Sequence, residues 1–174
     1  MLRQKFVTNI WSDSIDINDS LIKKFDEWVE FEKTLDSEGR TESTTQNGWQ
    51  YSFTPKDKTP DWLEILQSQI KMIKEEITWS HIKSSWVVDY NKGGFQDAHY
   101  HAPENDLKTI IINLRGEGDL LLFDPRPMAV SQGQPIVDIV NLKQGDWIAI
   151  PGWLVHSTRP CTDHRSIYVL DVYS

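Results

Sequence analysis

The chain has 174 residues, enough for one domain with a single hydrophobic core, and its formal charge is −8 with histidine counted as neutral. This acidic balance argues against a nonspecific nucleic-acid binder and against attachment to anionic membranes, because both need basic surface. The single cysteine, Cys161, excludes an intrachain disulfide and a multi-cysteine zinc site. No apolar signal segment or membrane-spanning run is visible, so we expect a cytoplasmic protein.

Residues 1–78 are expected to form a helical N-terminal part. Asp19 or Ser20 is placed to cap a first helix. The apolar residues that follow have the i, i+3, i+4 spacing of an amphipathic helix, and they are Leu21, Ile22, Phe25, Trp28 and Val29. The polar stretch from Asp36 to Gly48 then predicts a surface loop.

A second helix is indicated after residue 58. Thr59 is the expected N-cap, and Pro60 is expected at the first helical position, where its missing N–H does no harm. Apolar residues then recur at helical spacing, at Trp62, Leu66, Ile70, Ile73 and Ile77.

From about residue 79 the apolar period changes to that of strands. The candidate strands are Ile82 to Tyr90, Leu107 to Leu114, Leu120 to Phe123, Ile136 to Asn141, Trp147 to Ile150 and Ser166 to Tyr173. Glycine- and proline-containing turns separate them, and no helical pattern lies between them. We therefore predict one domain over 1–174, α+β but mainly β, with an antiparallel jelly-roll barrel over 79–174 and the helices packed on it.

Three of the five histidines have a spacing that suits a metal site. His99 and His101 are separated by one residue, so in an extended segment their side chains point the same way. His156 follows a later Pro-Gly turn at the mouth of another strand. Imidazole is a good ligand for iron, zinc, copper and nickel, so the three are candidate ligands of one ion.

A candidate anion-binding residue follows these histidines. Arg165 opens the last apolar strand, nine residues after His156. From there a guanidinium could pair bidentately with a carboxylate that lies deep in the barrel. Arg159 is a second cation nearby that could substitute for it or assist it.

Several short motifs accompany these residues in a fixed order. They are Gly48-Trp49, Trp86 to Tyr90, His99-Tyr100-His101 with Ala102-Pro103, Phe123-Asp124-Pro125-Arg126, Gly145-Asp146, Pro151-Gly152-Trp153, His156 and Arg165-Ser166. From about Trp49 onward, this order resembles the Fe(II)- and 2-oxoglutarate-dependent oxygenases, and most of all the small oxygenases of marine bacteria and cyanophages. The spacing Tyr90-x-x-Gly93-x5-His99 is also similar to that of members whose tyrosine contacts the cosubstrate.

The resemblance implies a double-stranded β-helix and a division of roles. His99 and His156 would be iron ligands, Arg165 would hold the distal carboxylate of 2-oxoglutarate, and Tyr90 would assist it. The implied reaction is oxidative decarboxylation of 2-oxoglutarate to succinate and carbon dioxide, coupled to hydroxylation of a second substrate. That substrate would be a small molecule or a protein, and the host cytoplasm would be the location of a phage-encoded enzyme.

The sequence departs from this family at one ligand position. His101 stands where the family usually has aspartate or glutamate. Three readings are open: His101 is a third imidazole ligand, Asp97 or Glu104 supplies a carboxylate, or the site binds metal without activating oxygen. A site with three imidazoles would leave the metal more positively charged than a site with one carboxylate.

Two alternatives use the same residues. The runs Gly93-x5-His99-x-His101 and Gly145-x5-Pro151-x4-His156 also resemble the two motifs of cupins, which often use three histidines and need no 2-oxoglutarate. A non-catalytic metal-binding barrel is the other alternative. Arg165 favours the oxygenase, since a cupin has no fixed need for it.

The remaining candidates are expected to be structural. His81 and His164 lie at a strand start and in a turn, away from the predicted cluster. Most of the eight tryptophans are expected in the core, with Trp86 and Trp153 as candidates to line a pocket. The native metal, the third ligand and the oligomeric state stay open.

Overall fold

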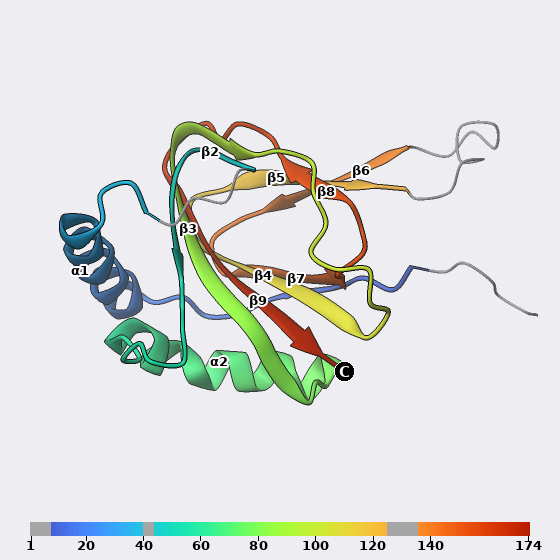
Figure 1. Cartoon of the computed structure of the whole chain (residues 1–174), viewed down its shortest axis with the longest axis horizontal. Coiled ribbons are helices and arrows are strands. Elements are labelled where there is room, and N and C mark those ends of the chain that lie inside the picture. The colour runs from blue at the N-terminus through green and yellow to red at the C-terminus, as the bar shows by residue number, and fades with distance from the viewer. Residues whose placement is uncertain (1–7, 40–43, 125–135) are drawn as a thin grey trace, which may run out of the picture.

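The computed structural model describes residues 8–39, 44–124 and 136–174. Figure 1 shows two helices beside two sheets, and both helices lie on the same side of the larger sheet. The elements are β1 (Trp11–Ser14), α1 (Asp19–Leu35), β2 (Thr45–Ser52), α2 (Asp61–Ile77), β3 (His81–Gln96), β4 (Leu107–Arg115), β5 (Gly118–Phe123), β6 (Val137–Leu142), β7 (Asp146–Pro151), β8 (His156–Thr158) and β9 (Arg165–Tyr173).

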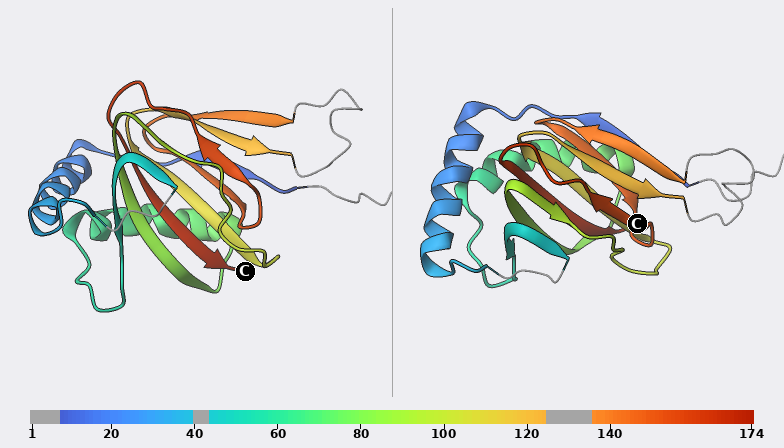
Figure 2. Two further views of the ribbon diagram at one scale, coloured as in Figure 1. Left: turned by 45° about the horizontal axis from the view of Figure 1, so that its top comes forward. Right: turned by 90° about the horizontal axis from the view of Figure 1, so that it is seen from above.

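The strands form two antiparallel sheets. The larger sheet has the order β1-β7-β4-β9-β3-β2, and the smaller sheet has the order β6-β5-β8. Figure 2 shows the smaller sheet lying against the larger one, on the side away from α2. All strand pairs in the described residues are antiparallel. The predicted class, mainly β with two N-terminal helices packed on a barrel, is confirmed.

The central strands contribute side chains to two hydrophobic cores, one on each face of the larger sheet. Val87 packs in the core under the helices, while its neighbour Val88 packs in the core between the two sheets. Tyr168 and Val169 of β9 divide in the same way. This division follows from the period of two, by which successive side chains of a strand point to opposite faces.

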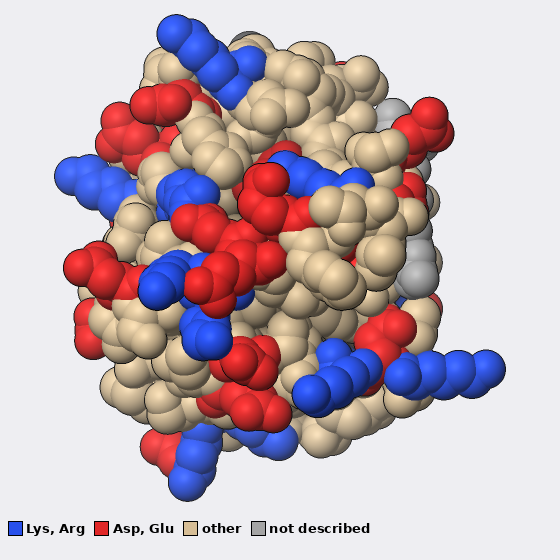
Figure 3. Space-filling view, turned by 90° about the vertical axis from the view of Figure 1, so that its left-hand side faces the viewer, with Lys and Arg blue, Asp and Glu red and all other residues tan. Residues whose placement is uncertain are grey.

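Aromatic side chains join the helices to the larger sheet. Trp62 of α2 meets the ring of Phe25 from α1 at 5.2 Å and the ring of Tyr168 from β9 at 5.4 Å, both edge to face. On the outside, Lys24 of α1 lies 3.4 Å from Asp61 of α2. Figure 3 shows acidic and basic side chains interspersed over this side of the molecule, so its surface is mixed in sign.

Both helix starts differ from the predictions. Asn18, not Asp19 or Ser20, is the N-cap of α1, and its Oδ1 accepts the Leu21 N–H at 3.0 Å. The second helix begins one residue later than expected, because Pro60 is in extended conformation (φ −74°, ψ 152°) and serves as the N-cap in place of Thr59. A proline N-cap has no side-chain acceptor for the first helical N–H groups.

The predicted loop over residues 36–48 is wrong at its end, where β2 begins at Thr45. The prediction of a helical 1–78 part is therefore incomplete, because β1 and β2 belong to it. The short strand β8 was also missed. Each of these strands gains its hydrogen bonds from a partner far along the chain, which local patterns do not reveal.

The glycine turn predicted after Tyr90 is a bulge inside β3. The β2–β3 register jumps from Gly48 opposite Tyr90 to Gln46 opposite Phe95. Gly93, at φ +82°, and Gly94 pair instead with the backbone of Cys161. Of the predicted motif Phe123-Asp124-Pro125-Arg126, the last two residues lie outside the described ranges. Neither described helix is long and apolar enough to cross a membrane.

Candidate metal centre

The backbone brings the three histidines together. His99 follows β3, and His156 begins β8; the two exchange hydrogen bonds, His99 N–H to His156 O at 3.0 Å and His156 N–H to His99 O at 2.9 Å. His101 is held by its own N–H, which donates to Gly152 O at 2.8 Å. Backbone hydrogen bonds thus fix the main-chain position from which each imidazole projects.

The three imidazoles converge. One nitrogen from each of His99, His101 and His156 lies within 4.8 Å of the other two, and the ring centroids are 4.4 to 5.2 Å apart. Two nitrogens bound to one ion at about 2.1 Å are at most about 4.2 Å apart, so a small inward movement of the rings brings all three onto one metal.

The outer nitrogen of each ring already has a partner. His99 Nδ1 lies 2.7 Å from Asp97 O, and His156 Nδ1 lies 2.9 Å from Leu154 O. His101 Nδ1 lies 2.8 Å from the Asp171 carboxylate. Because these oxygens only accept, each Nδ1 carries a proton, so in the neutral ring the lone pair is on Nε2. This tautomer is the one that Nε2 ligation of a metal requires.

The surroundings keep two of the rings neutral. Burial is the main cause that lowers the pKa of His99, and burial together with the nearby His99 and His101 rings lowers the pKa of His156 to about 3. A neutral imidazole has a lone pair that can coordinate a metal ion, so these two rings are in the form that binds metal.

Neither predicted carboxylate joins the cluster. Asp97 is exposed, and its side chain accepts from Gln46 Nε2 at 3.1 Å. Glu104 is also exposed. Within the described part of the chain, the grouping of possible ligands is His99, His101 and His156 alone.

A narrow cavity joins the cluster to Arg165. His101, His156 and Arg165 all line it, and its volume is about 10 Å³, room for about one water molecule. Arg165 is 1% exposed, and its Nε donates to Asn113 Oδ1 at 2.7 Å. Among the described residues, this is its one side-chain hydrogen bond. No carboxylate of these residues lies within ion-pair distance of it, although the charge of Asp119 acts on it from farther away.

Gly118 provides the space for this guanidinium, a role that the sequence analysis missed. A Cβ at position 118 would lie 2.6 Å from Arg165 Nη1 and 3.0 Å from its Cζ. Asn113 is the other residue missed here, since it lies inside an apolar strand run and gives no separate signal. Both are recognisable only once Arg165 has been placed.

Tyr90 is placed beside the cavity but does not line it. It lies opposite Arg165 in the β3–β9 register, and its hydroxyl donates to Gln96 Oε1 at 3.2 Å. Burial raises the pKa of this phenol well above its usual range, so it stays protonated. Gln96, not Tyr90, reaches the cavity wall.

A wider cleft of about 290 Å³ also borders the cluster. His99, His101 and Asp171 line it together with Phe53 and Tyr100. Trp86, Gln96 and His101 line both this cleft and the inner cavity, so these three side chains separate the two spaces. Of the two tryptophans considered for a pocket, Trp86 lines one, while Trp153 packs against the core between the sheets.

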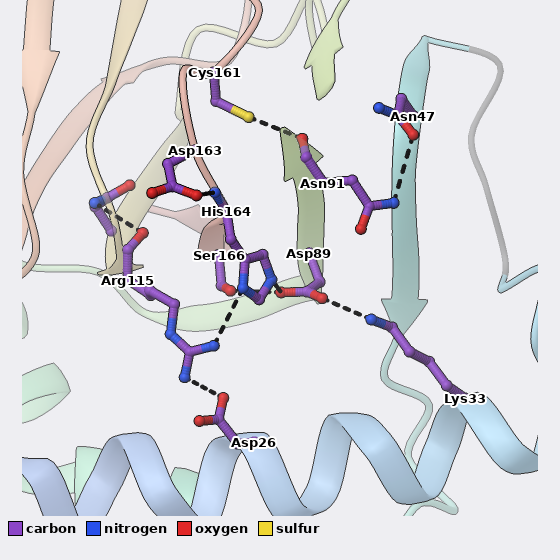
Figure 4. Close-up of polar contacts among 11 residues, drawn as sticks. Asp26, Lys33, Asn47, Asp89, Asn91, Arg115, Cys161, Asp163, His164 and Ser166 are labelled. Carbon is purple, nitrogen blue, oxygen red and sulfur yellow. Dashed lines mark hydrogen bonds and ion pairs between the residues drawn. The ribbon is translucent and has the colours of Figure 1, made fainter. Parts of the chain in front are cut away.

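The remaining cations and histidines lie elsewhere. Arg159 is exposed and pairs with Asp119 at 3.1 Å, and His81 is exposed and contacts Ser80 and the ring of Tyr173. His164 donates from Nε2 to the buried Asp89 at 2.8 Å, in the polar network of Figure 4. None of these residues lines the inner cavity or the cleft.

Solved structures with this fold include two hydroxylases. A prolyl-4-hydroxylase from Pseudomonas putida has a TM-score of 0.65 at 10% identity, covering 96% of this chain and 94% of that chain. A prolyl hydroxylase from Trichoplax adhaerens, in complex with a hypoxia inducible factor oxygen degradation domain peptide fragment, has a TM-score of 0.66 at 11% identity, covering 94% and 83%.

The storage protein vicilin from Corylus avellana is also similar, with a TM-score of 0.50 at 16% identity, covering 79% of this chain and 32% of that chain. No protein-family model and no curated protein matches the sequence. At these identities the likeness shows the fold alone, and the expected jelly-roll architecture is confirmed. The resemblance to oxygenases of marine bacteria and cyanophages stays a prediction.

Proposed function

We propose that this chain is an Fe(II)- and 2-oxoglutarate-dependent oxygenase, an oxidoreductase that hydroxylates an unidentified small molecule or protein and releases succinate and carbon dioxide. His99, His101 and His156 would hold the iron through Nε2, and Arg165 would hold the oxo acid. When bound, the metal and the oxo acid supply the oxidising chemistry, and the chain positions them and limits access of water. Two structural neighbours named as hydroxylases support this proposal.

The observation that carries the proposal is the Arg165 side chain. A buried guanidinium without a carboxylate in direct contact is costly, because the charge has lost water and the charge of Asp119 acts on it only from beyond ion-pair distance. Arg165 shares its cavity with two of the three histidines, so a carboxylate bound there would lie beside the metal. A dicarboxylate that chelates the metal and reaches Arg165 would satisfy both charges.

The narrow cavity sets a condition for this binding. A space of about 10 Å³ is smaller than 2-oxoglutarate, so side chains that line it, such as Trp86 and Gln96, would have to shift when the acid enters. The wider cleft would then receive the second substrate, next to His99 and His101.

The second candidate is a three-histidine metalloenzyme of cupin type that does not use 2-oxoglutarate. It is favoured by the third imidazole itself, which stands where the oxygenase family usually has a carboxylate. The two proposals share the metal site and differ in Arg165, so tests of metal and of 2-oxoglutarate separate them.

The metal site is tested by titrating Co(II) into the metal-free protein. We expect His156→Ala and His99→Ala to abolish stoichiometric binding, because each removes one of three ligands. His164→Ala is the matched control, since that histidine contacts Asp89 outside the cluster, and it should bind as the wild type does. Unchanged binding by His156→Ala would overturn both enzymatic proposals and leave a barrel with structural histidines.

The use of 2-oxoglutarate is tested by succinate release with the Fe(II)-loaded protein. Arg165→Met should weaken 2-oxoglutarate binding by at least about 100-fold and leave Co(II) binding unchanged. Gly118→Ala, whose methyl group would displace the guanidinium, should raise the KM for 2-oxoglutarate by about tenfold. Arg159→Gln is the control and should change neither. An iron-loaded protein that yields no succinate would favour the cupin-type enzyme.

A further inference from the structure

Asp171 is a carboxylate that contacts the metal cluster through His101 and is not itself one of the grouped ligands. Its Oδ1 accepts from His101 Nδ1 at 2.8 Å and from Thr109 Oγ1 at 2.7 Å. Its Oδ2 accepts from Ser84 Oγ at 3.3 Å. The side chain is 9% exposed, so these contacts replace most of its hydration.

The sheet fixes the position of this carboxylate. Asp171 is in β9, and in the strand register it faces Thr109 of β4 on one side and Ser84 of β3 on the other. Its hydrogen-bond donors therefore come from the two strands that flank it in the middle of the larger sheet. A side chain held in this way can orient a ring that comes from a loop, and His101 lies in the segment between β3 and β4.

His101 is the ring of the three that is oriented by a charge. His99 and His156 donate from Nδ1 to neutral backbone carbonyls two residues earlier in the chain. His101 donates instead to a carboxylate 70 residues away in sequence. In the described part of the chain, Asp171 has no lysine or arginine partner, and its ion-pair contact is with His101. Its negative charge is thus directed at this imidazole.

We propose that Asp171 is a positioning residue for the metal site. It holds the His101 ring with Nε2 toward the other two histidines, and it supplies the negative charge that three neutral imidazoles lack. A carboxylate on the far nitrogen of a ligating histidine fixes the ring and makes it a stronger donor. The carboxylate thus acts through an imidazole here, while the third coordination position stays nitrogen. This inference rests on the proposed metal site.

The test compares two isosteric substitutions of buried aspartates, Asp171→Asn and Asp89→Asn, by Co(II) titration of the metal-free proteins. In Asp171→Asn the amide oxygen can still accept from His101 and Thr109, so the change removes charge and keeps most of the geometry. We expect Asp171→Asn to weaken Co(II) binding 10- to 100-fold, the usual effect of losing such a partner, and to shift the visible absorption bands of the bound Co(II). Asp89→Asn makes the same change opposite a histidine outside the cluster, so it should leave both readouts unchanged.

A second variant keeps the test decisive if Asp171→Asn folds poorly. Thr109→Val removes one donor to the Asp171 carboxylate and preserves the side-chain volume, so we expect a loss of Co(II) affinity of a few-fold in a folded protein. Wild-type affinity and an unchanged Co(II) spectrum in either folded variant would overturn the role of Asp171. The proposed function fails separately, when His156→Ala binds Co(II) as tightly as the wild type.

Discussion

Two buried aspartates of the larger sheet each pair with a histidine, and the two pairs differ in what surrounds them. Asp171 accepts from His101, and Asp89 accepts from His164, both at 2.8 Å. Asp89 also accepts from Lys33 of α1 at 2.8 Å and from the Ser166 hydroxyl at 2.5 Å. Figure 4 shows how these partners enclose the Asp89 carboxylate.

The two histidines differ in whether a ring nitrogen is left without a partner. His164 uses Nε2 for its aspartate, and its Nδ1 lies 3.4 Å from Arg115 Nη1, so neither nitrogen is available to a ligand. His101 uses Nδ1 and leaves Nε2 facing two further imidazoles. The same pair of residue types is therefore structural where cations surround it and is a candidate metal ligand where a lone pair is left free.

The largest effect on stability is expected from Asp89→Ala. The substitution leaves Lys33, His164 and the buried Ser166 hydroxyl without their acceptor, and breaking a buried ion pair costs about 3 kcal/mol. Urea unfolding should show this loss in the free energy of unfolding, while Co(II) affinity stays at the wild-type value. A loss of Co(II) affinity in the folded protein would remove the distinction between the two pairs.

A smaller effect on the free energy of unfolding is expected when the pH is lowered. Burial raises the pKa of Asp89, but hydrogen bonds from Lys33 and Ser166 and the nearby His164 lower it by more, so the pKa lies below its usual range. The ionised form is then favoured by folding, and its contribution is present above about pH 4 and is lost as the pH falls through the folded-state pKa. The difference in unfolding free energy between wild type and Asp89→Asn should therefore be larger at pH 7 than at pH 3. A constant difference would mean that the charge of Asp89 does not stabilise the fold.

The two pairs also show which residues of the site could be predicted from the sequence. The spacing of His99 and His101 and the Pro-Gly turn before His156 are local signals, and the structure brings these three residues together. Asp171 gives no such signal, because it lies within an apolar strand and contacts a histidine 70 residues earlier. Long-range contacts of this kind depend on strand register, which one sequence does not specify.

The fold shows the same limit. The helices and the central strands were predictable, since their apolar residues repeat at a clear period. The edge strand β2 was not, because Asn47 and Gly48 have the composition of a turn and its pairing with β3 supplies the order. Gly118 lies between two predicted strands and has no local signal of its own, because its contact with the Arg165 guanidinium depends on the fold.

A modest effect is expected from His164→Ala. The ring is partly exposed and shares Asp89 with Lys33 and Ser166, so its removal leaves the carboxylate with two donors. We expect a loss of about 1 kcal/mol in the free energy of unfolding, which is typical of one hydrogen bond. The unfolding midpoint in urea measures it. A loss as large as that of Asp89→Ala would assign the stabilisation to the histidine and not to the lysine.

The smallest effect is expected at the solvent edge of the same network. Asp26 of α1 pairs with Arg115, whose other contact is His164 Nδ1, and the Asp26 side chain is 43% exposed. Exposed ion pairs contribute little, so Asp26→Asn should cost about 0.5 kcal/mol and should lose most of that effect in high salt. Urea unfolding at low and high ionic strength measures both. Because Lys33 fixes α1 to the sheet through the buried Asp89, the outer pair adds to an attachment that already exists. A cost near that of Asp89→Ala would place the main attachment of α1 at Arg115 instead.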